Sequence, residues 1–208
     1  MNVGAGAGSY EPRDLDVVAV EPSAVMAAQR PPGAAPVIAA RAEALPFADG
    51  AFDAAMAVLT DHHWDDRVGG LRELRRVARR AVVVTFDPAW ADAYWAVRDY
   101  LPGFRALPGL AIEEIASALG PGARVEPLPV PADCEDGFFL AWWKRPEALL
   151  EPEVRQAISV FHRLDAEEVD AFARRLRADL ASGAWAARNA ELLELDELDL
   201  GLRLVVAG

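Results

Sequence analysis

The sequence MNVGAGAGSY, residues 1–10, places glycine at every second position from Gly4 to Gly8. Glycine lets the backbone turn tightly after a strand, and it lets a ligand approach where a Cβ would clash. The apolar run DVVAVE, residues 16–21, follows this loop and ends in an acidic residue, Glu21. A glycine loop after one strand and an acidic residue at the end of the next are typical of the nucleoside-binding half of an α/β fold. A carboxylate at that point can accept hydrogen bonds from both ribose hydroxyls.

Composition limits the class of protein. The 208 residues have the length of a single domain, and a hydrophobic content of 53% favours a packed globule. The formal net charge of −12 disfavours partners such as nucleic acid or an anionic membrane. A single cysteine, Cys134, excludes an intramolecular disulfide and fits a reducing compartment. We therefore expect a cytoplasmic monomer or homodimer without membrane or nucleic-acid partners.

The order of apolar segments predicts a Rossmann-like, mostly parallel sheet with helices on both faces. The expected strands are residues 16–21, 37–40, 52–59, 81–86, 124–130 and 202–207. Apolar residues at helical spacing predict helices over 68–77, 112–119 and from Asp165 to near Gly183, with Asp165 and Glu168 forming a capping box. We expect one domain over 1–208, with a cofactor-binding half at 1–90. The substrate-side half at 91–208 would contain a helical insertion at 133–185.

Two features depart from a complete nucleoside-binding half. Only Ser9–Leu15 separates the glycine loop from the next strand, which is too short for a helix and its return loop, so we expect a turn there. The chain also begins inside the first expected strand, so we expect an N-terminally shortened form of the fold.

Two further signals follow in the N-terminal half. The first is AEALPF at residues 42–47, and the second is DGAFD at 49–53, which leads into an apolar run and then DHHW at 61–64. With these four signals in order over residues 1–90, the chain resembles the class I S-adenosylmethionine-dependent methyltransferases, in particular the small-molecule group with the "LPF…FD" signature. The resemblance implies the class I methyltransferase fold with an antiparallel last strand. It also implies in-line methyl transfer to a small molecule, such as a natural product or a metabolic intermediate.

The resemblance also implies a set of cofactor contacts. The loop residues Gly4, Ala5 and Gly6 would lie against the methionine portion of S-adenosylmethionine, and Glu21 would hold its ribose. The adenine would be contacted by the side chains of Met26 and Leu45 and by the backbone N–H of Ala42. Pro22, Glu43 and Leu59 complete the set. The family often has aspartate before that alanine, whereas this chain has Arg41, so the contact to the exocyclic amine is absent or passes to Glu43. NAD is disfavoured because Ser9 stands where a dinucleotide loop has its third glycine.

Methyl transfer from a sulfonium needs alignment and exclusion of water, and it needs a base only when the nucleophile is protonated. His62 and His63 follow an expected strand, so either is a candidate general base or substrate contact, with a structural role as the alternative. A metal site with Asp61, Asp65 and Asp66 is disfavoured, since adjacent histidines diverge. The expected substrate pocket residues are Trp64, Asp87, Trp90, Tyr94 and Trp95, with burial in the core as the alternative for the aromatic ones.

A second class of function stays open. The short first strand, the missing helix and Arg41 also fit a methyltransferase-fold protein that does not transfer methyl groups. Such a protein would be a binding or partner subunit, or a repurposed enzyme such as a cyclase.

Overall fold

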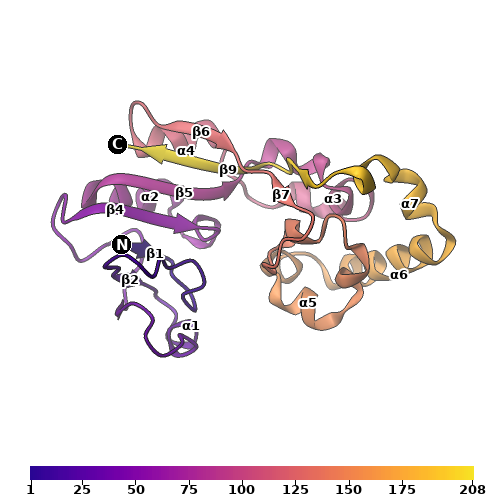
Figure 1. Ribbon diagram of the computed structural model, residues 1–208, viewed down its shortest axis with the longest axis horizontal. Helices are drawn as coiled ribbons and strands as arrows, with labels where there is room; N and C mark the ends of the chain where they lie inside the picture. The colour runs from indigo at the N-terminus through magenta and orange to yellow at the C-terminus, as the bar shows by residue number, and fades with distance from the viewer. The chain divides into compact units, whose positions relative to one another are not determined.

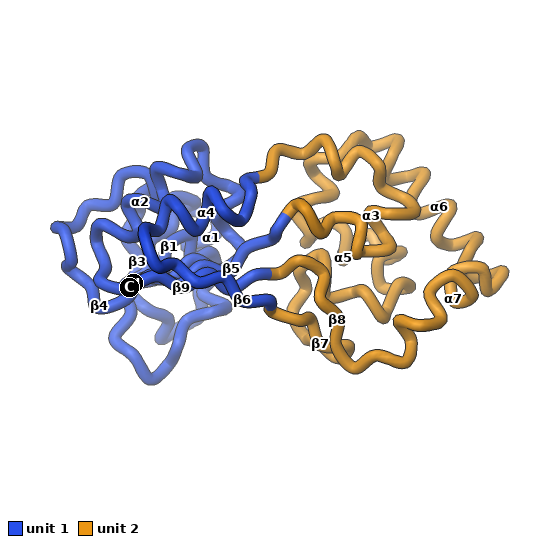
Figure 2. Tube along the Cα trace, turned by 90° about the horizontal axis from the view of Figure 1, so that it is seen from above, with its two compact units in different colours: residues 1–87, 110–127, 203–208 blue, residues 88–109, 128–202 orange.

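The computed structural model describes all residues from Met1 to Gly208, which form two compact units (Figure 2). Unit 1 comprises residues 1–87, 110–127 and 203–208, and unit 2 comprises residues 88–109 and 128–202. The halves expected from the sequence, 1–90 and 91–208, follow the chain. Unit 1, in contrast, also takes in two later segments.

Unit 1 is built on a seven-stranded sheet with the order β3-β2-β1-β4-β5-β9-β6. Its strands are β1 (Asn2–Val3), β2 (Ala19–Val20), β3 (Val37–Ile38), β4 (Phe52–Val58), β5 (Ala78–Phe86), β6 (Arg124–Pro127) and β9 (Leu202–Ala207). The strands from β3 to β5 pair in parallel, whereas β9 pairs with β6 antiparallel. Figure 1 shows β9 running opposite to β4. The predicted mostly parallel sheet with an antiparallel last strand is confirmed.

The strand β1 is short but central. Asn2 pairs with Ala19 on one side and with Met56 on the other. The N-terminal amine of Met1 extends this pairing by donating to the Ala54 carbonyl at 2.9 Å. The carboxyl end of β1 is therefore fixed between β2 and β4, and the glycine loop begins there.

Helices flank this sheet: α1 (Ala24–Ala28), α2 (Arg67–Val77), α4 (Ile112–Leu119) and the short 3₁₀ helix η1 (Asp61–His63). The apolar faces of α2 and α4 supply Leu71, Leu74, Ile115 and Leu119, all fully buried, to a core shared with Val3 and the central strands. The helix over 112–119 has the predicted bounds, because Gly120 ends it with a φ of 109°. Residues 9–15 form turns without a helix, as expected.

Some expected strands are shorter than their apolar runs. The run at 16–21 contributes only Ala19–Val20, and the run at 124–130 divides into β6 and β7 (Val130–Pro131). In unit 2, β7 pairs antiparallel with β8 (Glu197–Leu198) as a separate small sheet.

The rest of unit 2 is helical. Its α-helices are α3 (Trp95–Asp99), α5 (Pro152–Ala157), α6 (Ala166–Ser182) and α7 (Ala184–Arg188). They are joined by the 3₁₀ helices η2 (Pro88–Ala93), η3 (Pro102–Ala106), η4 (Phe139–Trp142), η5 (Pro146–Leu150), η6 (Ser159–His162) and η7 (Ala190–Glu194). Aromatic rings form the core, and the indole N–H of Trp95 donates to the Trp143 carbonyl at 2.8 Å. None of the helices in the chain combines the length and the apolar character needed to cross a bilayer.

The predicted capping box at the start of α6 is wrong. Asp165 occupies the N-cap position, but its side chain makes no capping hydrogen bond. The Glu168 carboxylate instead accepts from the backbone N–H of Gly103 at 2.7 Å. A donor 65 residues away in the sequence therefore takes the carboxylate that the local pattern assigned to the cap.

Candidate cofactor site

The glycine loop turns away from β1 across the neighbouring strand ends. Gly4, Gly6 and Gly8 have φ values of 68°, 51° and 91°, in the left-handed region that favours glycine. The N–H groups of Gly4 and Ala5 both donate to the Val20 carbonyl, at 2.9 and 3.0 Å. A Cβ on Gly4 would lie 2.0 Å from Thr60 Oγ1, so the loop can pass the end of β4 only with glycine there.

Glu21 lies directly after β2 and faces the same loop. Glu21 as a whole is only 8% exposed. One carboxylate oxygen accepts from the N–H of Gly6 at 2.8 Å, and the other accepts from the N–H of Ser23 at 2.8 Å. A carboxylate offers about four lone pairs, so two hydrogen bonds leave acceptor capacity on both oxygens.

Two predicted adenine contacts, Met26 and Leu45, belong to different segments of unit 1. The Met26 methyl carbon lies 3.5 Å from the position that a Cβ on Gly6 would occupy, which places this half-exposed side chain against the loop. Pro22 is exposed, whereas Ala42 and Leu45 are buried.

The segment that carries Leu45 is fixed by two residues of α2. The Leu45 N–H donates to the Glu73 carboxylate at 3.1 Å, and Arg76 donates to the carbonyls of Leu45 and Phe47. Arg76 also donates to Glu73, and this hydrogen bond lowers the pKa of the Glu73 carboxyl below its ordinary value. This pair was not among the residues predicted from the sequence, although its i, i+3 spacing is a local signal.

The residues next to Ala42 are held by the loop after η1. Arg41 pairs with the exposed Asp65, and the Glu43 carboxylate accepts from the Asp66 N–H at 3.2 Å. Glu43 therefore has a partner within the chain beside its expected role at the adenine.

The chain leaves β4 through a strained residue. Leu59 is the one non-glycine residue with a positive φ, 52°, a conformation found at turns and functional sites. The next acidic residue, Asp61, is fully buried and accepts from the Thr85 hydroxyl at 2.9 Å. It also pairs with Arg67 at 2.5 Å, which fixes the start of α2 to the ends of β4 and β5.

The histidine candidates lie in the turn fixed by Asp61. The rings of His62 and His63 have centroids 4.0 Å apart, and His63 is exposed while His62 is half-buried. Trp64 packs against α2 at Gly70, where a Cβ would lie 2.5 Å from the indole ring. No group of three or more His, Cys, Asp or Glu side chains is placed to hold a metal ion.

The remaining predicted pocket residues are distributed over the two units. Asp87 is buried at the end of the first segment of unit 1, whereas Trp90 is exposed in η2 of unit 2. Tyr94 and Trp95 are fully buried, with ring centroids 5.4 Å apart, and this burial fits the alternative of core packing. The Tyr94 hydroxyl has no hydrogen-bond partner, and burial raises its pKa well above the usual range. A role in the substrate pocket stays a prediction for all four.

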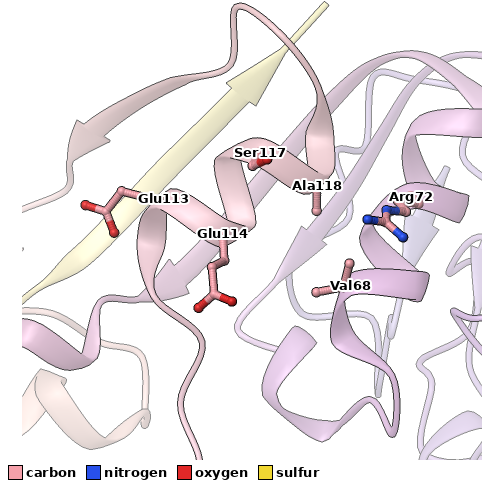
Figure 3. Close-up of a pocket in the computed structure, with 6 residues that line it drawn as sticks. All are labelled: Val68, Arg72, Glu113, Glu114, Ser117 and Ala118. Carbon is pink, nitrogen blue, oxygen red and sulfur yellow. The ribbon is translucent and has the colours of Figure 1, made fainter.

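A separate open groove of about 300 Å³ lies between α2 and α4 (Figure 3). It contains none of the predicted site residues, and its lining mixes one arginine with two glutamates: Val68, Arg72, Glu113, Glu114, Ser117 and Ala118. The cofactor prediction therefore rests on the strand ends and not on this groove.

Comparisons with known proteins agree with this geometry. A methyltransferase domain family matches residues 1–86. A crystal structure from Anabaena variabilis, of a protein named as a methyltransferase from an antibiotic biosynthesis pathway, is 32% identical with a TM-score of 0.90. The match covers 100% of this chain and 90% of that one.

Two further relatives are more distant. The uncharacterized protein YafE of Escherichia coli K12 is 28% identical over 140 residues, 62% of this chain, and the match spans 63% of its own length. The [4+2]-cyclase SpnF shares the fold, with a TM-score of 0.52 and 16% identity over 99% of this chain and 72% of that one.

The strand order, the glycine loop and the acidic residue after β2 together define a class I methyltransferase fold. With full-length similarity to the Anabaena protein, the chain belongs to the class I S-adenosylmethionine-dependent methyltransferase family.

Proposed function

We propose that this chain binds S-adenosylmethionine at the carboxyl ends of β1, β2 and β4 and transfers its methyl group to a small molecule. The observation that carries the proposal is the Glu21 carboxylate, which is buried beside the glycine loop and keeps acceptor capacity on both oxygens. Its position in a class I methyltransferase fold is where a ribose is bound.

The residues of unit 1 fit this cofactor. Glu21 would accept from the ribose hydroxyls, and the loop from Gly4 to Gly6 would lie against the methionine portion, where a Cβ on Gly4 has no room. Met26, next to Gly6, and the buried Leu45 would contact the adenine, together with Ala42. Pro22, Glu43 and Leu59 would border the same site.

S-adenosylmethionine supplies an already activated methyl group, so the protein has mainly to orient the acceptor and exclude water. The turn after β4 is rigid because Asp61 is bonded to Thr85 and Arg67. We infer that this turn presents His62 or His63 to the acceptor, as a substrate contact or as the base that takes its proton.

The small-molecule substrate is inferred from three features. The chain resembles the small-molecule group in its LPF segment, and the Anabaena relative is named for an antibiotic pathway. The net charge of −12 disfavours nucleic acid as the acceptor. We propose Trp64 and Asp87 of unit 1 as substrate contacts, and the cytoplasm as the place of action.

A repurposed reaction without methyl transfer is the second candidate. The similarity to the cyclase SpnF concerns the fold alone, and the pairing of Arg41 with Asp65 leaves the usual aspartate contact of the family without a counterpart at that position. In this case the chain would bind the cofactor without consuming it.

Calorimetric titration with S-adenosylhomocysteine tests the cofactor site. We expect wild-type binding, and binding about tenfold or more weaker in Glu21→Ala, because charged hydrogen bonds contribute about 1.5–3 kcal/mol each. Glu126→Ala, which changes an exposed glutamate on β6, is the matched control and should bind like the wild type.

Equal affinity in wild type and Glu21→Ala would contradict the proposed ribose contact. No binding by the wild type would contradict the proposal that the chain uses S-adenosylmethionine. If the chain binds S-adenosylmethionine without consuming it, and a screen still detects conversion of a small-molecule substrate, the repurposed enzyme is favoured.

A further inference from the structure

We propose that Glu11 and Arg30 form a positioning pair that holds the glycine loop in its ligand-binding shape. The inference rests on the proposed function, because it assigns these two residues to the cofactor affinity of the same loop. Neither residue was singled out by the sequence motifs.

The pair is joined to the loop by direct contacts. Arg30 Nη1 donates to the Gly6 carbonyl at 3.2 Å, and Arg30 Nη2 donates to the Glu11 carboxylate. At Gly8, a Cβ would lie 3.3 Å from Arg30 Nη1 and 3.4 Å from Glu11 Oε2. The loop therefore packs on the ion pair along its second half.

The same pair closes a larger ring of backbone. Arg30 Nη2 also donates to the Ala35 carbonyl at 3.0 Å, and the Ala35 N–H donates to the other Glu11 oxygen at 3.1 Å. Three separate segments, at residues 6–11, 30 and 35, thus meet at one guanidinium and one carboxylate.

Burial makes the pair specific. The side chain of Arg30 is 5% exposed and that of Glu11 is 8% exposed. A buried ion pair adds little net stability, because the cost of desolvating both charges offsets their attraction. We infer that this pair instead selects one arrangement of the loop. Here the arrangement that satisfies both charges is the one in which the Gly6 carbonyl points to Arg30.

The loop needs such a device because it contains three glycines and no helix follows it. Glycine loses more conformational freedom on ordering than any other residue. Residues 9–15 form only turns, so no helix holds the far end of the loop. Gly6 is instead held on both sides, with its N–H on Glu21 and its carbonyl on Arg30. Arg30 thus fixes the orientation of Gly6, whose N–H contacts Glu21 at the proposed ribose site.

The test compares the double variant Glu11→Gln/Arg30→Met with Asp179→Asn/Arg188→Met. The second variant removes a partly exposed arginine–carboxylate pair from unit 2. Calorimetry with S-adenosylhomocysteine, well below the unfolding temperature, gives the affinity of the folded protein. Hydrogen exchange of the Gly6–Gly8 amides reports the order of the loop without any ligand.

We expect affinity about tenfold weaker in the loop variant, as for a binding-competent loop populated to about one tenth, and faster exchange at Gly6–Gly8. The unit 2 variant should leave both unchanged. Arg30→Lys keeps the charge but reaches fewer acceptors, so it should give an intermediate affinity. A general loss of stability would leave the affinity of the folded protein unchanged in all of these variants.

Wild-type affinity in the loop variant, or unchanged exchange at Gly6–Gly8, would overturn the inference. If the wild type itself does not bind S-adenosylhomocysteine, the proposed function fails. The exchange measurement then decides alone, with faster exchange supporting the ordering of the loop by this pair and unchanged exchange refuting it.

Discussion

At the scale of single residues, Gly4 is the position where the fold and the proposed site impose the strictest demand. Its φ of 68° and the 2.0 Å distance from a would-be Cβ to Thr60 Oγ1 act together. We expect Gly4→Ala to lower the free energy of unfolding by about 3 kcal/mol, from a left-handed conformation and overpacking combined. Urea denaturation measures this loss.

Gly33 provides the matched control for Gly4. Its φ of 84° is also left-handed, but nothing lies within 4 Å of a Cβ added there. Gly33→Ala should therefore cost only the conformational part, about 1 kcal/mol. Equal losses in the two variants would mean that Thr60 moves aside freely, and that close approach does not explain glycine at residue 4.

At the scale of elements, the N-caps of α2 and α6 are both aspartates but differ in what they do. The Asp66 carboxylate accepts from the Gly69 N–H at 2.8 Å, whereas the Asp165 side chain makes no capping bond. We expect Asp66→Ala to cost about 1 kcal/mol of stability, as is usual for a lost cap. Asp165→Ala should stay within about 0.5 kcal/mol of the wild type.

Chemical denaturation of the two cap variants provides the measurement, with each serving as the control of the other. A loss at Asp165 as large as that at Asp66 would show that α6 is capped in solution after all. It would restore the capping box with Glu168 that the local sequence pattern predicted.

At the scale of the whole molecule, the sequence predicts what is encoded locally. Alternation of apolar runs and glycine breaks identified the sheet, the loop at Gly4–Gly8, and α4 with its bounds. The polar contacts around the site could not be found in this way. Asp61 meets Thr85, and Glu11 meets Arg30, only because the fold brings strand ends and turns 19 to 24 residues apart together. The division of the chain into two units likewise depends on which distant segments pack together.

The response of the whole molecule to acid depends on both units, because each contains a carboxylate with a lowered pKa. In unit 1 the hydrogen bond from Arg76 lowers the pKa of Glu73. In unit 2 the Tyr100 hydroxyl, and then Arg188, lower that of Asp179. A carboxyl whose pKa is lower in the folded state stabilises the fold above its unfolded pKa, and that stabilisation is lost as pH falls through the folded pKa.

Glu73→Gln and Asp179→Asn should therefore be less stable than the wild type at neutral pH, and each difference should shrink as the pH falls below the ordinary values of 4.5 and 3.8. Because the two residues belong to different units, their effects in the double variant should add to within about 0.5 kcal/mol.

Urea midpoints between neutral and acidic pH measure these differences in stability, with the exposed Glu153→Gln as control. The net charge of −12 destabilises the folded state at neutral pH through self-repulsion. This effect is common to all the variants and largely cancels in the differences between them. Differences that stay constant down to acidic pH would show that neither carboxylate stabilises the fold through its charged form.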